Sequence, residues 1–154
     1  LQGLWVSMCS MCALTAISSE TGVVMNALFY IGLGLFIYGF CTEIIADNQK
    51  SKFRSIPENR DKFITTGLWA KSRHPNFFGE IVLWAGIAVM SFSSLNGLQY
   101  LTLISPVFTY LLLVYVSGVR MLEARADKKW GKDEEYVKYK SETPVLMIKY
   151  LGRP

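Results

Sequence analysis

The sequence predicts an all-α fold, a polytopic membrane helical bundle of about four transmembrane helices plus a short C-terminal interfacial helix. Of the 154 residues, 51% are hydrophobic, and the mean hydropathy of +0.28 is high for a chain with 18% charged residues. All 16 lysines and arginines fall in two blocks, residues 50–73 and 120–153. Long apolar segments separated from clustered basic residues are typical of membrane proteins. We expect residues 1–154 to form a single membrane domain.

The first two apolar segments form the first predicted hairpin. Residues 1–17 are apolar, and a helix of that length reaches about 26 Å, close to the ~30 Å hydrocarbon core of a bilayer. A polar loop separates this segment from residues 23–46, which contain Gly32, Gly34 and Gly39. Such small residues favour close helix contact inside a bundle.

The other two apolar segments form the second predicted hairpin. Residues 77–92 are the third segment, and the fourth lies within residues 98–119. Serine often caps helices and proline suits the first helical position. Ser105 and Pro106 therefore predict a regular helix that begins there and continues past Arg120.

The C-terminal part of the chain combines charged with aromatic residues. Gly131 is a predicted helix stop, and residues 134–140 are a predicted amphipathic helix with tyrosine and lysine side chains. Such residues are common where a protein meets the membrane surface. We therefore expect this helix to lie at the interface and to contact membrane lipids.

The distribution of basic residues predicts the topology. The loops at residues 18–22 and 93–97 contain no lysine or arginine, whereas both basic blocks lie at the opposite ends of the hairpins. The positive-inside rule then directs the basic face toward the cytoplasm or an equivalent compartment. The endoplasmic reticulum and an organellar membrane such as the mitochondrial inner membrane both satisfy this topology. A net charge of +4 that only borders the membrane spans argues against nucleic acid as a partner.

Two acidic residues lie close to the apolar segments, where an ionised side chain costs about 2–3 kcal/mol. Glu43 lies about one turn from the end of the second segment, and Glu80 lies near the start of the third. At helical spacing, Glu43, Asp47 and Lys50 share one face. One interpretation is a salt-bridge stripe at the membrane interface, and the other is a functional site.

The Arg-His-Pro-Asn motif that begins at Arg73 contains the single histidine of the sequence. Pro75 forces His74 out of helical conformation and suits the first turn of the third helix. The helix N-terminus beside Arg73 favours an anion, and Asn76 and Glu80 face the same side at i,i+4 spacing. A catalytic base is one interpretation of His74, and the favoured one is a capped helix start with a hydrogen-bonded histidine.

Two further groups have a structural interpretation that we favour over a functional one. Cys9 and Cys12 stand three residues apart in an apolar run without a second ligand pair, so we interpret them as helix-contact residues and expect no metal site. Arg125 and Lys128 lie with Lys129 in the second basic block, where contact with lipid headgroups is the default explanation.

Ordered motifs run along nearly the whole chain. They lie at residues 46–54 (ADNQKSKFR), 67–69 (GLW), 72–80 (SRHPNFFGE) and 122–131 (LEARADKKWG), followed by Tyr136, Thr143 and Pro144. Together they resemble the C-terminal domain of the steroid 5-alpha-reductase family, in a largely uncharacterised membrane branch. The resemblance implies an integral membrane reductase that uses NADPH to saturate a carbon–carbon double bond conjugated to a carbonyl, in a lipid or steroid-like enone.

The resemblance also implies site residues. By matching motif positions, the cofactor contacts would be Asp47, Arg54, Arg73, Asn76 and Glu80, with Arg125 and Lys128 from a looser match. Arginines and helix N-termini suit the phosphates of a dinucleotide. The family's proton donor and its partner carboxylate lie in an N-terminal half that this sequence lacks, so no catalytic residue is assigned. Because the first residue is not methionine, we expect the natural chain to extend further at its N-terminus.

The sequence leaves two alternatives open. The pattern from Arg73 to Gly79 is also similar to isoprenylcysteine carboxyl methyltransferases, which use S-adenosylmethionine. Those enzymes carry paired glutamates where this chain has Glu123 and Ala124, and they lack a block like residues 47–53, which favours the reductase. The other alternative is a non-catalytic structural or accessory subunit of a larger membrane complex, with lipid in place of the cofactor.

Overall fold

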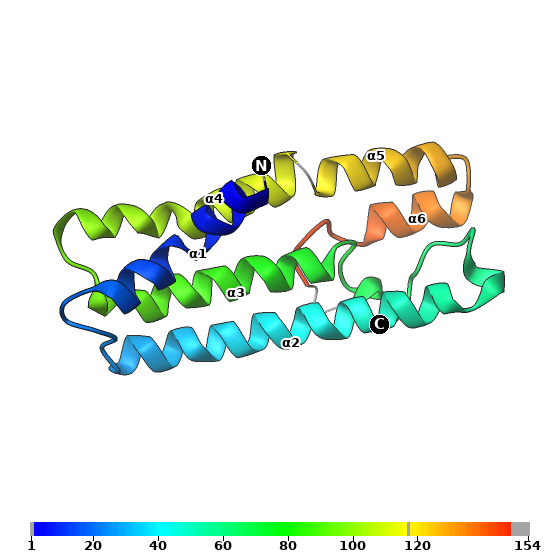
Figure 1. Ribbon diagram of the computed structural model, residues 1–154. Helices are drawn as coiled ribbons and strands as arrows, with labels where there is room; N and C mark the ends of the chain where they lie inside the picture. Colours follow the sequence, from blue (N-terminus) through cyan, green and yellow to red (C-terminus); the bar gives the residue numbers. More distant parts are fainter. Residues whose placement is uncertain (1, 117, 149–154) are drawn as a thin grey trace.

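In a computed structural model, the described residues, 2–116 and 118–148, fold into helices and their connections without a strand (Figure 1). The α-helices are α1 (Gln2–Ser18), α2 (Ala27–Ser55), α3 (Pro75–Ser91), α4 (Ser105–Leu111), α5 (Val119–Trp130) and α6 (Glu134–Glu142). Short 3-10 segments are η1 (Pro57–Asn59), η2 (Gly67–Ala70), η3 (Phe92–Ser94) and η4 (Gly97–Ile104), and η5 (Leu112–Val116) is a π-helical turn. The all-α prediction is confirmed.

Within the described residues, three helical stretches are long and apolar enough to cross a membrane. They cover Ala27–Ser55, Pro75–Ser94 and Gly97–Trp130, and a shorter apolar helix covers Val6–Ser18. Large apolar side chains such as Ile31, Ile37 and Ile45 are exposed on α2, as a lipid-facing surface requires. The predicted integral membrane bundle is confirmed, with one helix shorter than the other three.

The two loops without basic residues meet at one end of the bundle (Figure 1). The amide of Val24 donates to Ser94 Oγ at 2.9 Å, and Asn26 Nδ2 donates to Ser93 Oγ at 2.7 Å. The described residues of both basic blocks lie at the opposite end, as the charge distribution predicted. That end comprises the C-terminal part of α2, residues 56–74, α5 and α6, and it holds the candidate site.

α2 and α3 pack antiparallel along a seam of glycines. A Cβ atom on Gly39 would lie 2.5 Å from the Gly79 carbonyl oxygen, and one on Gly32 would lie 2.6 Å from that of Gly86. Backbone atoms occupy the space that a side chain would need, so the two helices are in direct backbone contact. The predicted close contact is confirmed for Gly32 and Gly39. It is wrong for Gly34, which has nothing within 4 Å because it faces away from α3.

α2 starts later and ends later than the apolar segment that predicted it. Asn26 caps the helix, because its side chain accepts a hydrogen bond of 3.2 Å from the amide of Phe29. At the other end the helix continues through the polar residues as far as Ser55. This part of α2 packs against η2, where Trp69 Nε1 donates to the Ala46 carbonyl oxygen at 3.0 Å. α2 therefore extends from the membrane into the candidate site.

The fourth apolar segment is interrupted, and the prediction of one continuous helix past Arg120 is wrong. The 3-10 segment η4 precedes α4, whose regular turns begin at Ser105 as predicted. The π-helical turn η5 follows, and α5 begins only after Gly118, whose φ of −109° and ψ of −99° are not helical. A Cβ atom on Gly118 would lie 2.1 Å from the Leu113 carbonyl oxygen, so this conformation needs glycine.

Cys9 and Cys12 are buried where α1 packs on the fourth segment. Cys12 Sγ donates to the Thr102 carbonyl oxygen at 2.7 Å, and Thr109 Oγ1 donates to Cys9 Sγ at 3.1 Å. Ser105 Oγ also donates to the Cys9 carbonyl oxygen. Small polar side chains hold these helices together, which confirms the interpretation of the two cysteines as helix-contact residues.

Candidate functional site

A cavity of about 310 Å³ lies at the basic end of the molecule, with α2 and the loop after it on one side and α5 and α6 on the other (Figure 1). Most of its lining is basic or aromatic. The basic residues are Lys50, Arg54, Lys62, Arg73, Arg125 and Lys129, and the aromatic ones are Phe53, Phe63, Trp69, Trp130, Tyr136 and Tyr139. The lining is completed by Ile64, His74, Leu122, Glu123 and Ala126.

The cavity carries an excess of positive charge, because the described part of the chain contributes six basic side chains and one carboxylate to its lining. Arg73 is paired with that carboxylate, Glu123, and Lys129 is paired with Asp61 outside the lining. Among the described residues, no ion pair includes the other four bases of the lining. An excess of one charge in a concave site attracts ligands of the opposite charge, so the cavity favours anions.

The backbone of the Arg73–His74 turn is fixed by the C-terminal segment. Pro75 begins α3, and His74 before it has φ −137° and ψ 62°, outside the helical region as predicted. The amide of Arg73 donates to the Pro144 carbonyl oxygen at 2.9 Å, and the amide of His74 donates to that of Val145 at 3.1 Å. The residues at the start of α3 therefore have one fixed backbone direction.

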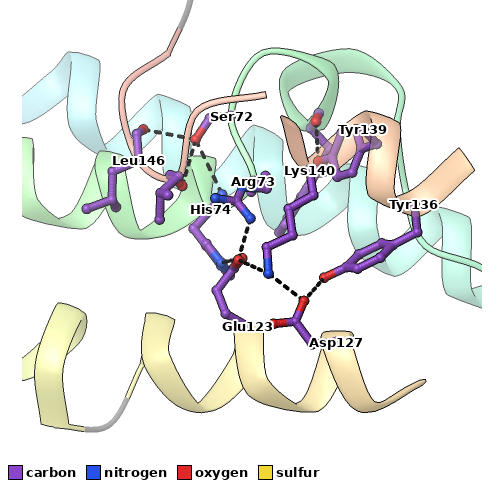
Figure 2. A network of polar contacts seen from close by, with 11 residues as sticks. Ser72, Arg73, His74, Glu123, Asp127, Tyr136, Tyr139, Lys140 and Leu146 are labelled. Carbon is purple, nitrogen blue, oxygen red and sulfur yellow. Dashed lines mark hydrogen bonds and ion pairs between the residues drawn. The ribbon is translucent and has the colours of Figure 1, made fainter. Parts of the chain in front are cut away.

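Glu123 of α5 joins the two side chains of this turn (Figure 2). Its Oε2 atom accepts from Arg73 Nη1, and its Oε1 atom pairs with His74 Nε2 at 2.7 Å. Lys140 Nζ of α6 lies 3.8 Å from Oε2. His74 is buried and hydrogen-bonded, as its structural interpretation requires, but its side chain does not cap α3, so that part of the prediction is wrong. Within the described residues, Arg73 Nε is a buried side-chain nitrogen without a hydrogen-bond partner.

α6 closes the cavity through lysine and tyrosine contacts (Figure 2). Lys140 Nζ donates to Asp127 Oδ1 at 2.5 Å, and the Tyr136 hydroxyl donates to the same oxygen at 3.0 Å. The Tyr139 hydroxyl donates to the Trp69 carbonyl oxygen at 2.6 Å. Burial raises the pKa of Tyr139 to about 12, and burial together with the Asp127 contact raises the pKa of Tyr136. Both phenols are therefore protonated hydrogen-bond donors at neutral pH.

A second set of contacts joins α5 to the loop after α2. Lys129 Nζ donates to Asp61 Oδ1 at 2.9 Å, and Trp130 Nε1 donates to the Asp61 carbonyl oxygen at 2.6 Å. The hydrogen bond from Lys129 and its positive charge lower the pKa of the Asp61 carboxyl. The ring of Phe63 packs edge-on against Trp130 and Tyr136, with centroid distances of 5.8 and 5.3 Å. These contacts fix α5 and α6 against the loop.

The residues predicted to contact a cofactor divide into two groups. Arg54, Arg73 and Arg125 line the cavity, whereas Asp47, Asn76, Glu80 and Lys128 do not. Asp47 lies one turn before Lys50 on α2. It interacts electrostatically with Glu43 on the same helix and with Glu80 on α3. None of the ion pairs among the described residues includes Glu43, Asp47 or Lys50, so the salt-bridge stripe is not formed.

Glu123, which organises the site, was not among the residues predicted from the sequence. It lies 50 residues from Arg73 along the chain, and no local spacing links the two. Trp69, Tyr136 and Tyr139 were likewise not predicted as parts of the cavity wall. The i,i+3 spacing of the two tyrosines, which places them on one face of a helix, was the available signal.

The fold and the site define a class of protein: a helical membrane protein with a basic, aromatic cavity at one end of the bundle. Residues 1–143 match the family described as "Protein of unknown function (DUF1295)". The chain belongs to this family, and the predicted resemblance to steroid 5-alpha-reductases is confirmed by the relatives it matches. No solved structure matches the chain.

Two kinds of curated protein are similar to the chain. It is 28% identical over 119 residues to 3-oxo-5-alpha-steroid 4-dehydrogenase 1 of Homo sapiens and of Macaca fascicularis, which covers 76% of this chain and 41% and 40% of those proteins. It is 32% identical over 92 residues to a probable O-methyltransferase of Ustilaginoidea virens, which covers 58% of this chain and 32% of that protein. The chain therefore spans less than half the length of these curated relatives.

Proposed function

We propose that this chain forms the NADPH-binding part of an integral membrane reductase. The substrate would be a lipid or steroid-like enone, whose carbon–carbon double bond conjugated to a carbonyl is reduced. The similarity to 3-oxo-5-alpha-steroid 4-dehydrogenases supports this reaction class. Because the chain spans about two fifths of those proteins, the proposal assigns it cofactor binding and no catalytic residue.

The observation that carries the proposal is the excess of bases in the cavity. The phosphate groups of NADPH are anionic acceptors, and arginine binds phosphate through parallel hydrogen bonds. Arg54 on α2 and Arg125 on α5 both line the cavity, so they would donate hydrogen bonds to phosphates from two helices. Arg73 also lines the cavity, and its guanidinium is held there by Glu123.

The residues present fit part of the cofactor. Ligand sites usually measure about 300–1,000 Å³, so a cavity of about 310 Å³ suits one half of a dinucleotide. Phe63, Trp69 and Tyr139 offer flat surfaces for a planar base. Asp47 and Glu80, which lie outside the cavity lining, would accept hydrogen bonds from sugar hydroxyls of the other half. When bound, NADPH would supply the hydride.

A membrane methyltransferase is the second candidate, because the chain is 32% identical over 92 residues to a probable O-methyltransferase. S-adenosylmethionine carries a positively charged sulfonium and no phosphate. A cavity with six basic side chains and one carboxylate repels such a cation. The charge of the site therefore favours the reductase.

If the cavity binds phosphates, removing two of its bases weakens NADPH binding. In the purified full chain, Arg54→Gln combined with Arg125→Gln should raise the dissociation constant about tenfold or more, since a hydrogen bond to a charged group contributes roughly 1.5–3 kcal/mol. The matched control is Lys52→Gln combined with Lys138→Gln, which removes the same charge from exposed positions outside the cavity lining. An equal loss of affinity in both double variants would contradict the proposed site.

A further inference from the structure

The Arg73–His74 turn is held from two sides, by main-chain contacts on one and by a carboxylate on the other (Figure 2). Ser72 is buried, and its hydroxyl donates to the Leu146 carbonyl oxygen at 2.9 Å. The amides of Arg73 and His74 donate to the two preceding carbonyl oxygens of the same C-terminal segment. Three consecutive residues thus bind three consecutive carbonyl groups, which fixes the direction in which the two side chains leave the backbone.

Glu123 meets these side chains from α5. Each carboxylate oxygen has its own partner, because Oε1 pairs with His74 Nε2 at 2.7 Å and Oε2 accepts from Arg73 Nη1. Lys140 adds a further basic side chain, with Nζ 3.8 Å from Oε2. The nearby acid Asp127 is itself bound to Lys140 Nζ at 2.5 Å and is not part of the cavity lining. Among the described residues, Glu123 is therefore the one carboxylate that can hold the turn from the cavity side.

We propose that Glu123 is a positioning residue for the anion-binding site. By accepting a hydrogen bond from Nη1, it holds the guanidinium of Arg73, a residue of the cavity lining, in one orientation. A carboxylate can only accept hydrogen bonds, so Glu123 also fixes the tautomer of His74 with the proton on Nε2. The inference rests on the proposed function in one respect, since the anion that the oriented Arg73 would attract is NADPH.

Glutamine in place of Glu123 removes one acceptor while it keeps the shape of the side chain. An amide has one oxygen, so it can accept from Arg73 or from His74 and must turn its NH2 group toward the other. If the NH2 group faces Arg73, two donors meet and the guanidinium loses its fixed orientation. If it faces His74, the proton must leave Nε2 so that this nitrogen can accept. Glu123→Asp keeps both acceptors on a side chain shorter by one methylene, so we expect its effect to lie between that of the wild type and that of Glu123→Gln.

The single histidine supplies a direct readout of this role. With ¹⁵N-labelled histidine in the full chain, nuclear magnetic resonance reports which imidazole nitrogen carries the proton. We expect a protonated Nε2 in the wild type, a changed Nε2 signal in Glu123→Gln, and an unchanged one in Glu134→Gln, an exposed position on α6. The same samples are titrated with NADPH, where Glu123→Gln should lose affinity about tenfold to hundredfold.

The two readouts separate the positioning role from the proposed function. An unchanged Nε2 signal in Glu123→Gln would overturn the positioning role, and so would an NADPH affinity within about twofold of the wild type. A wild type that does not bind NADPH, with a histidine signal that still depends on Glu123, would end the proposed function and leave the positioning role supported. A cooperative melting transition checks that each variant is folded. If Glu123→Gln does not fold, Glu123→Asp is used instead, and an Nε2 signal and an NADPH affinity that both equal those of the wild type would overturn the positioning role.

Discussion

One methyl group added to the glycine seam tests whether α2 and α3 touch through their backbones. In Gly39→Ala, the new Cβ atom would lie 2.5 Å from the Gly79 carbonyl oxygen and 2.5 Å from the Leu83 amide nitrogen. Both are backbone atoms of α3, so the helices must move apart, and overpacking of this kind costs about 1–3 kcal/mol. Gly34→Ala is the matched control on the same helix, because nothing lies within 4 Å of its Cβ position.

Both substitutions gain the same helix propensity, roughly 0.5–1 kcal/mol. We therefore expect Gly34→Ala to be more stable than the wild type by that amount, and Gly39→Ala to be less stable than Gly34→Ala by about 1–3 kcal/mol. In a chain of 154 residues, each kcal/mol moves the melting temperature by roughly 2–4 °C. Thermal unfolding of both variants in one detergent, followed by circular dichroism, measures the difference. Equal melting temperatures would refute the backbone contact.

Three further outcomes are expected. Ser72→Ala removes the hydrogen bond of a buried hydroxyl to the Leu146 carbonyl oxygen and should lower the free energy of unfolding by about 0.5–1.5 kcal/mol. The exposed Ser55→Ala should change it by less than about 0.5 kcal/mol. The pKa of Tyr139 is raised to about 12, so the protonated phenol stabilises the fold. This stabilisation should be complete below about pH 10, the pKa of a free tyrosine, and should be lost as the pH rises toward 12. The tyrosinate absorbance of the wild type minus that of Tyr139→Phe measures this titration. The pKa of Asp61 is lowered, so its ion pair with Lys129 should stabilise the fold at neutral pH and should lose this effect as the carboxyl becomes protonated on acidification. The difference in the free energy of unfolding between the wild type and Asp61→Asn, measured with denaturant at several pH values and salt concentrations, tests this.

The bundle could be predicted from the sequence because hydropathy and charge segregation are local properties of the chain. They implied that the two loops without basic residues lie at one end, and the hydrogen bond from Val24 to Ser94 agrees. Local patterns did not reveal which glycine contacts another helix, since Gly34 and Gly39 lie in the same apolar run and only Gly39 faces α3. The break at Gly118 was not predicted because the apolar segment continues up to it.

The site was harder to predict because tertiary packing brings its parts together. Sequence motifs grouped Asp47 and Glu80 with Arg54 and Arg73, but only the two arginines line the cavity. Glu123 lies in a charged stretch of α5 that resembles a solvated helix in the sequence, and its partner is 50 residues away. The contacts of Glu123 with Arg73 and His74, just before α3, give this carboxylate its role. That each of these residues serves a cofactor stays a prediction.

Titration of the purified full chain with NADPH and, separately, with S-adenosylmethionine is the most direct test of the proposed function. We predict saturable binding of NADPH alone, weakened by added salt, because the cavity carries six basic side chains and one carboxylate. Binding of S-adenosylmethionine alone would contradict the reductase and favour the methyltransferase. Binding of neither ligand would contradict both and favour an accessory role in a larger membrane complex.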